Sequence, residues 1–234
     1  MSDALLASLN LVVRPYKPED QAAIHEIFLM TAYNGHPSIN FIDDGAWLFD
    51  VMVSYYVTYE ADCCYVAELG GQVVGYLTGA KDTQTYQRVW TRKILPRLLR
   101  KFFTRGLFLQ GRVWGFLIHS LRSWVRGEFD LPPMSCYYYP AHFHINLHPL
   151  YHDKGMGSQL VNTFLAQLKS QSVHGVYART CRPEPSHPFF EKLKFGLYSK
   201  QDFTLWEYLE SRPYYLLTYA VLLRELPVPG LNHA

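Results

Sequence analysis

Residues 139–158, YPAHFHINLHPLYHDKGMGS, decide the fold. From Ala141 to Leu147 polar and apolar residues alternate, and this period of two predicts a strand with different side chains on its two faces. The turn from His148 to Gly157 then leads directly into a helix predicted to run to about Ser170. Its buried face carries Leu160, Val161, Phe164, Leu165 and Leu168.

The glycine turn of this stretch predicts a seat for a diphosphate. Gly155 and Gly157 let a ligand approach the backbone, and the free N–H groups and dipole of the helix start favour negative charge there. Lys154 adds a cation. A GxG alone is weak evidence, but here strand, turn and helix follow in the required order. The P-loop pattern is missing, and a single late GxG fits a dinucleotide-binding fold poorly.

The remaining chain predicts a mixed α/β fold, a sheet flanked by helices, in one domain that covers residues 1–234. Two glycines, Gly70 and Gly71, join two apolar runs and predict a hairpin. The predicted strands span 11–14, 64–69, 73–79, 141–147, 176–178, 203–208 and 215–222. Outside 84–134 the predicted helices span 21–30, 45–59, 157–170 and 185–193.

Four cysteines, Cys63, Cys64, Cys136 and Cys181, show neither CxxC pairs nor the spacing of metal ligands. We therefore expect no metal site and reduced thiols, as in a cytoplasmic or nuclear protein. The first residues lack the pattern of a signal peptide, and no apolar run is long enough to predict a membrane-spanning helix.

Residues 84–134 interrupt the alternation of strands and helices with a basic, aromatic-rich segment that predicts two or three helices, interrupted at Pro96, Gly106 and Gly111. Positions 84–130 carry a net charge of +8, and the rest of the chain carries −6. Three interpretations stay open: a helical cover with its arginines in water, a peripheral contact with an anionic membrane, or a polyanion site. A contact with a partner protein would bury the same apolar side chains, and nothing points clearly to nucleic acid. The oligomeric state stays open.

The pattern His152-x-x-Gly155-x-Gly157 resembles the signature of the GNAT superfamily of acyl-CoA-dependent N-acetyltransferases, Gln/Arg-x-x-Gly-x-Gly/Ala after the fourth strand. The likeness covers about residues 10–80 and 135–225, in family order, and leaves the insertion between the third and fourth strands. The stretch YPAHFHINLHPLYHDKGMG is especially similar to the acetyltransferase-like domain associated with O-GlcNAcases and to its bacterial stand-alone relatives. His142 and His144 resemble the paired histidines of serotonin N-acetyltransferase.

The resemblance implies a splayed central sheet of about seven strands and an acetyltransferase that uses acetyl-CoA as co-substrate. Acetyl-CoA would lie between the fourth and fifth strands and pass its acetyl group directly to a primary amine, either a small molecule or an exposed protein amine. The residues expected to bind it are Leu147, His148, Pro149, His152, Asp153, Lys154, Gly155, Met156, Gly157 and Ser158.

The alternation along 141–147 places His142, His144 and Asn146 on one face, and we expect these three side chains to serve catalysis by accepting and passing on the proton of the amine. The alternative is that this face is merely polar, or that the histidines are structural.

Two positions depart from the family. His152 replaces the long polar side chain that opens the signature, and Phe190 replaces the Tyr that protonates the departing thiolate. The replacement acid is unassigned, with Tyr138, Tyr139, Tyr177 and Tyr198 as candidates by sequence order. An acyl-CoA-binding module with little or no catalysis is therefore the alternative function.

Overall fold

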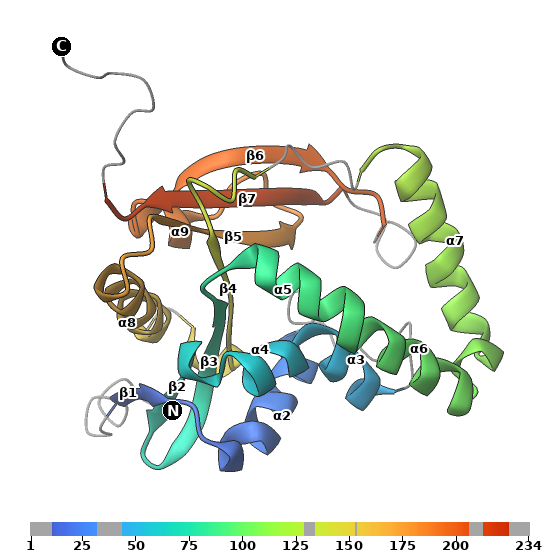
Figure 1. The fold of residues 1–234 in the computed structure, drawn as a ribbon, viewed down its shortest axis with the longest axis horizontal. Helices are drawn as coiled ribbons and strands as arrows, with labels where there is room; N and C mark the ends of the chain where they lie inside the picture. The colour runs from blue at the N-terminus through green and yellow to red at the C-terminus, as the bar shows by residue number, and fades with distance from the viewer. Residues whose placement is uncertain (1–10, 32–43, 129–133, 153, 206–212, 225–234) are drawn as a thin grey trace.

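The structure is a computed structural model that describes residues 11–31, 44–128, 134–152, 154–205 and 213–224. Its centre is a seven-stranded sheet in the order β1-β2-β3-β4-β5-β7-β6 (Figure 1). Of the strand pairs, β4 with β5 is parallel and the others are antiparallel. The strands are β1 (Leu11–Pro15), β2 (Cys64–Leu69), β3 (Gln72–Ala80), β4 (Ala141–Leu147), β5 (Gly175–Arg182), β6 (Gly196–Asp202) and β7 (Tyr215–Leu222). The predicted mixed α/β fold is confirmed.

Helices cover the two faces of this sheet and bury separate cores. On one face α8 (Met156–Ser170) and α9 (Pro188–Lys192) close a core around Phe143 and Phe164. On the other face lie α2 (Gln21–Thr31), α3 (Gly45–Met52) and α4 (Ser54–Tyr59), whose cores include Tyr76 and Tyr56. Short turns of helix connect them: η1 (Pro18–Asp20), η3 (Ala61–Cys63) and η6 (Pro149–Tyr151).

Two predicted elements differ from the structure. The helix expected over 45–59 is divided into α3 and α4 at Val53. The strand expected at 203–208 is wrong: β6 lies earlier, at Gly196–Asp202, and positions 206–208 lie outside the described residues. Since β6 is an edge strand with mostly exposed side chains, its sequence GLYSKQD shows no alternation of apolar and polar residues.

The insertion forms α5 (Thr83–Val89), η4 (Trp90–Ile94), α6 (Leu95–Thr104), η5 (Leu107–Leu109) and α7 (Gly111–Val125). Pro96 does not interrupt the continuous helical run of α5, η4 and α6. The wider π turn of η4 precedes this proline and accommodates its missing backbone N–H. Gly106, at φ 65°, follows the end of α6, and α7 then stands beside the sheet (Figure 1). No helix within the described ranges is both long and apolar enough to cross a bilayer.

The insertion is fastened to α3 by backbone acceptors for two indole rings. Nε1 of Trp47 donates to the carbonyl of Leu98 at 3.2 Å, and Nε1 of Trp90 donates to the carbonyl of Val51 at 3.5 Å. One wall of the cavity described next is therefore held in place by residues of the insertion.

Candidate active site

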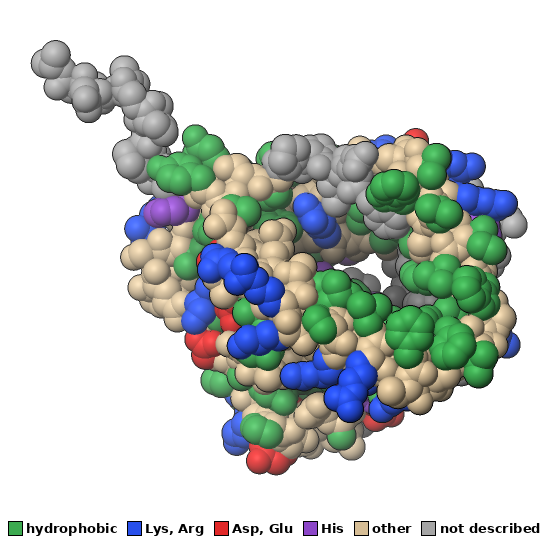
Figure 2. All heavy atoms as spheres, turned by 45° about the vertical axis from the view of Figure 1, so that its right-hand side comes forward, with side chains coloured by type: hydrophobic (Ala, Val, Ile, Leu, Met, Phe, Trp, Pro, Cys, Tyr) green, Lys and Arg blue, Asp and Glu red, His purple; other side chains and the backbone are tan. Residues whose placement is uncertain are grey.

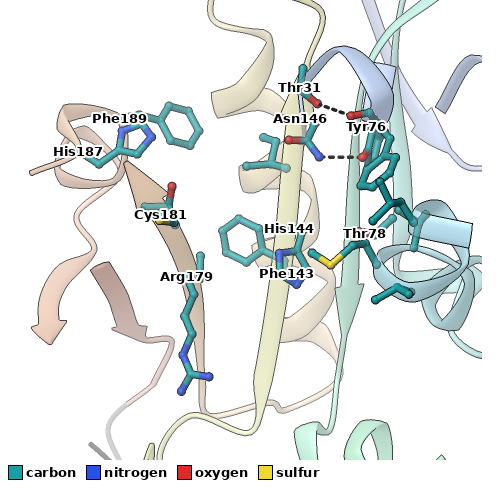
Figure 3. A pocket seen from close by; sticks show the side chains of 18 of the residues that line it. Thr31, Tyr76, Thr78, Phe143, His144, Asn146, Arg179, Cys181, His187 and Phe189 are labelled. Carbon is teal, nitrogen blue, oxygen red and sulfur yellow. Dashed lines mark hydrogen bonds between the residues drawn. The ribbon is translucent and has the colours of Figure 1, made fainter. Parts of the chain in front are cut away.

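The strands β4 and β5 separate soon after they begin. Their pairing stops at Phe143 and Ala178, after three residue pairs (Figure 3). The backbone N–H of His148 donates to Val74 on β3 at 2.9 Å, so the even-numbered residues of β4 hydrogen bond to β3. The odd-numbered residues Ile145 and Leu147 consequently direct their backbone groups into the gap beside β5.

A cavity of about 520 Å³ opens at this gap. Its walls are mostly aromatic and aliphatic, and they come from α2, α3, β3, β4, β5, α7 and the start of α9. The polar side chains among them are those of Thr31, Tyr76, Thr78, His144, Asn146, Arg179, Thr180 and His187. Among the lining residues, all of them within the described ranges, there is no Asp or Glu.

The start of α8 lies beyond the end of β4 and has the geometry of an anion seat. Gly155 is its N-cap at φ 78°, a left-handed conformation, and no side chain caps the first turn. A side chain at Gly155 would meet nothing within 4 Å, so the backbone is open to a ligand there. At Gly157 an added Cβ would lie 3.0 Å from the ring of Phe189, a tight contact that the ring would have to move to relieve.

The other residues predicted to bind the cofactor surround this seat. Leu147 ends β4, His148 is the N-cap of η6, Pro149 begins η6, and Met156 and Ser158 lie in the first turn of α8. Lys154 is exposed beside Gly155, and Asp153 lies outside the described residues. His152 turns back toward the strand, since its Nε2 lies 3.1 Å from the carbonyl oxygen of Leu147 and donates to it.

His142 is enclosed by hydrogen bonds that fix its tautomer. The hydroxyl of Thr83 donates to the carbonyl of Pro140 at 2.8 Å, so Nδ1 of His142, 2.8 Å from that hydroxyl, must be the donor. Nε2 then accepts from Tyr56 at 2.9 Å. Burial, with the nearby His144 and Arg179, lowers the pKa of His142 to about 3. This buried neutral imidazole does not line the cavity.

His144 and Asn146 do line the cavity, two and four residues further along the same face of β4. Burial and the positive charge of Arg179 lower the pKa of His144 to about 4, so it is unprotonated at neutral pH. Asn146 donates from Nδ2 to the hydroxyl of Tyr76 at 2.7 Å (Figure 3). The structure thus brings two of the three predicted catalytic side chains to the cavity and places His142 behind them.

His187, on the opposite wall, was not predicted as a site residue. It is the N-cap of α9, and its ring contacts that of Phe190 at a centroid distance of 5.0 Å. Burial and Arg182 lower the pKa of His187 to about 4, and its buried Nδ1 has no hydrogen-bond partner within the described structure. The only hint in the sequence is that His187 lies three residues before the Phe that replaces the family's Tyr.

Phe190 itself is stacked on Tyr219, with centroids 5.1 Å apart. The hydroxyl of Tyr219 accepts from the backbone N–H of His187 at 2.8 Å and donates to Glu191 at 3.2 Å, so it supports α9 from below. The four tyrosines considered as replacement acids, Tyr138, Tyr139, Tyr177 and Tyr198, are absent from the cavity walls.

Comparison with known proteins agrees with this geometry. The family model described as the acetyltransferase (GNAT) family matches residues 22–195. A structure of SsHAT is 25% identical, with a TM-score of 0.67 over 92% of this chain and 100% of that one. An N-acetyltransferase from Staphylococcus aureus Mu50 is 16% identical, with a TM-score of 0.57 over 92% of this chain and 99% of that chain.

Of two further structures of the same fold, one holds acetyl-CoA and the other is a polyamine N-acetyltransferase. A protein from Salmonella typhimurium, solved with its cofactor acetyl-CoA, is 15% identical (TM-score 0.55, 94% of this chain, 98% of that chain). A polyamine N-acetyltransferase from Drosophila melanogaster is 16% identical (TM-score 0.53, 91% and 100%). Because the family model covers most of its length, the chain belongs to the GNAT family of acetyltransferases.

Proposed function

We propose that this protein transfers the acetyl group of acetyl-CoA directly to a primary amine, small or on a protein surface. The parting of β4 from β5 is the observation that carries the proposal. It leaves the backbone of Ile145 facing a cavity that an imidazole lines from each side, His144 on β4 and His187 on α9. The anion seat of α8 adjoins the same gap.

Two parts of acetyl-CoA, its diphosphate and its pantetheine, would each find backbone groups to bind in this arrangement. Its diphosphate would take the uncapped N–H groups of Met156, Gly157 and Ser158. Its pantetheine would run along the gap, where the backbone of Ile145 and the N–H of Leu147 have no partner on β5. The carbonyl of Leu147 is already used by His152, so the carbonyl of Ile145 is the acceptor that remains for the pantetheine.

The transfer needs one proton to leave and one to arrive. The amine nitrogen would form a bond to the carbonyl carbon, negative charge would develop on the carbonyl oxygen, and the carbon–sulfur bond would then break to release the CoA thiolate. The N–H of Ile145 is the donor best placed to stabilise that oxygen. His144 accepts a hydrogen bond from the amine, and, since its low pKa makes it a weak base, passes the proton on to solvent.

His187 is our candidate for the group that meets the sulfur. In this family a Tyr at the position of Phe190 is expected to protonate the thiolate, and the ring of His187 packs against Phe190. A neutral imidazole donates a hydrogen bond to the sulfur, and the negative charge that develops there raises the pKa of the imidazole, which draws a proton in from solvent.

The chemistry of the cavity narrows the acceptor. Arg179 on β5 lines the same cavity as His144, with its guanidinium over the ring of Tyr177, and no carboxylate lines the described walls. A second positive charge on the acceptor would therefore be repelled, whereas aromatic and aliphatic walls favour an apolar body. We propose a monoamine with an apolar or aromatic body as acceptor. Since all four cysteines are free, we propose a cytoplasmic or nuclear location.

The alternative is an acyl-CoA-binding module with little or no catalysis. Phe190 and His152 favour it, and so does the resemblance of 139–157 to the domain associated with O-GlcNAcases. Titration calorimetry with acetyl-CoA, followed by a thiol-release assay over monoamines, diamines and lysine peptides, separates the two. Binding with turnover supports the transferase, binding without turnover of any amine supports the module, and no binding contradicts both.

A further inference from the structure

The insertion carries a concentrated apolar surface that the acetyl-transfer site does not use. Of the eighteen exposed large hydrophobic side chains in the described structure, nine lie between positions 99 and 125. Figure 2 shows hydrophobic side chains gathered on the right-hand side of the molecule, with Lys and Arg around them. A contiguous apolar surface of this kind marks an interaction site more often than chance exposure does.

Most of this surface belongs to one face of α7, which we name the outer stripe. Its residues recur every three or four positions, as on one side of a helix. They are Trp114, Leu117, Ile118, Leu121, Trp124 and Val125, and their exposed fractions range from 42% to 73%. Phe103 and Leu109, 61% and 76% exposed, extend the stripe at the corner between α6 and α7.

The side of α7 opposite the outer stripe already packs against the core, so the stripe is not the core-facing side of this helix. Val113, on the inner side of α7, is buried in the core that α2 and α3 form, and Phe116 packs against that core. Ser123 is buried on the same inner side. The indole of Trp114 donates to the carbonyl of Phe108 at 2.9 Å, which holds that ring at the corner with more than half its surface exposed.

The exposed charged side chains around the outer stripe are positive. Arg112 and Arg122 are exposed along α7, and Arg97 and Arg100 along α6. Arg126, exposed directly after α7, lies 3.8 Å from Glu128. The one acidic residue between positions 84 and 128 is Glu128. It is buried, where it accepts from the backbone N–H and hydroxyl of Thr204 at 2.8 and 2.7 Å.

We propose that the outer stripe and its arginines dock the protein onto an anionic lipid bilayer. Tryptophan and leucine on one face with arginine beside them are the composition of helices that lie in a membrane interface. A second copy of this face would bring like charges together, and a nucleic acid would leave the indole and leucine side chains in water. Because no described helix can cross a bilayer, the binding is peripheral.

Vesicle co-sedimentation tests this directly, without acetyl-CoA or any amine. Purified protein is mixed with vesicles of phosphatidylcholine alone, or with about a third phosphatidylserine, over a range of salt. We expect binding to the anionic vesicles, at least about tenfold weaker to the neutral ones, and weakening as salt rises. Trp114→Ala with Trp124→Ala should reduce the binding about tenfold, and Arg112→Gln with Arg122→Gln by a similar factor.

Leu197→Ala is the matched control, because Leu197 is 48% exposed on the edge strand β6 and should leave binding unchanged. Circular dichroism checks that all variants fold, and their thiol-release activity on a soluble amine should equal that of the wild type. No binding to anionic vesicles at low salt overturns the proposal. Two further results, each in the absence of vesicle binding, also overturn it. One is a concentration-dependent dimer that the tryptophan substitutions abolish, and the other is nucleic-acid binding that those substitutions do not affect.

Discussion

The hydroxyl of Tyr56 donates to Nε2 of His142 across 86 positions of sequence, at 2.9 Å. Thr83 accepts from the other ring nitrogen, so the imidazole is neutral and fully hydrogen-bonded. A histidine held in this way positions β4 against α4 and α5. His144, two residues further along the same face, lines the cavity, whereas His142 does not.

Stability should depend on pH through His142. Its pKa is about 3 in the folded state and about 6.5 when unfolded, so as pH falls below about 6.5 only the unfolded chain takes up the proton. The free energy of unfolding therefore decreases by about 1.4 kcal/mol per pH unit from this residue alone. Urea unfolding between pH 7 and 4.5 should show a shallower slope for His142→Gln.

Tyr56→Phe is the matched variant for this measurement. It keeps the imidazole buried but removes the donor to Nε2, which should lower the free energy of unfolding by about 1–3 kcal/mol at pH 7 and leave the slope in place. If His142→Gln and the wild type have the same slope, burial of the neutral imidazole is not the cause.

His144→Gln should reduce kcat by roughly a hundredfold and leave the Kd for acetyl-CoA unchanged, because in the proposed reaction this cavity-lining imidazole accepts from the amine and does not contact acetyl-CoA. A thiol-release assay measures kcat, and titration calorimetry measures the Kd for acetyl-CoA. In the wild type, kcat/KM should rise with pH until the acceptor amine is itself deprotonated, since His144, at a pKa of about 4, is already neutral. A variant within about threefold of wild-type kcat would assign the amine proton to solvent alone.

His187→Ala should lower kcat about tenfold or more, because the departing sulfur loses its hydrogen-bond donor. Phe190→Tyr in that background should restore much of the rate, since it supplies a hydroxyl on the same cavity wall, where Phe190 stacks on Tyr219. The ratio of the two rates is the measurement. A His187→Ala enzyme with normal kcat, or no rescue by the hydroxyl, would remove His187 from the reaction.

The sequence predicted the parts of this fold whose signals are local. Alternation along β4 gave the shared face of His144 and Asn146, and Gly70-Gly71 gave the hairpin of β2 and β3. His187 could not be predicted in the same way. It shares a cavity with the side chains of β4 only because β4 and β5 part after Phe143. The family resemblance implied a splayed sheet, but no local pattern shows where the strands part or which side chains then meet.

The enclosure of His142 was likewise hidden, because its partners come from α4 and α5, 86 and 59 positions away. Alternation showed which face His142 shares with His144 and Asn146, but not that two hydroxyls cover it. The edge strand β6 was misplaced for the opposite reason, since exposed side chains impose no alternation on its sequence.

Gly155→Ala should weaken acetyl-CoA binding about tenfold. The left-handed φ of 78° costs any other residue about 1–2 kcal/mol, and relief of that strain moves the backbone of the anion seat. Gly111→Ala is the control, because that glycine also has open space around it but needs no positive φ. Calorimetry should show normal affinity for the control, and equal affinity in the two variants would contradict the role of the seat.

Arg179→Gln should change which amines react. The positive charge of Arg179 opposes a second cation in the cavity, and at a partly screened distance this is worth about 1–2 kcal/mol, or roughly tenfold in kcat/KM. We therefore expect kcat/KM for a diamine to rise about tenfold relative to an apolar monoamine of the same length. Lys200→Gln, which removes a cation that lies over Tyr215 away from the cavity, is the control. If the ratio of the two substrates is the same in wild type and Arg179→Gln, charge on β5 does not select the acceptor, and the choice of amine must rest on the shape of the apolar walls.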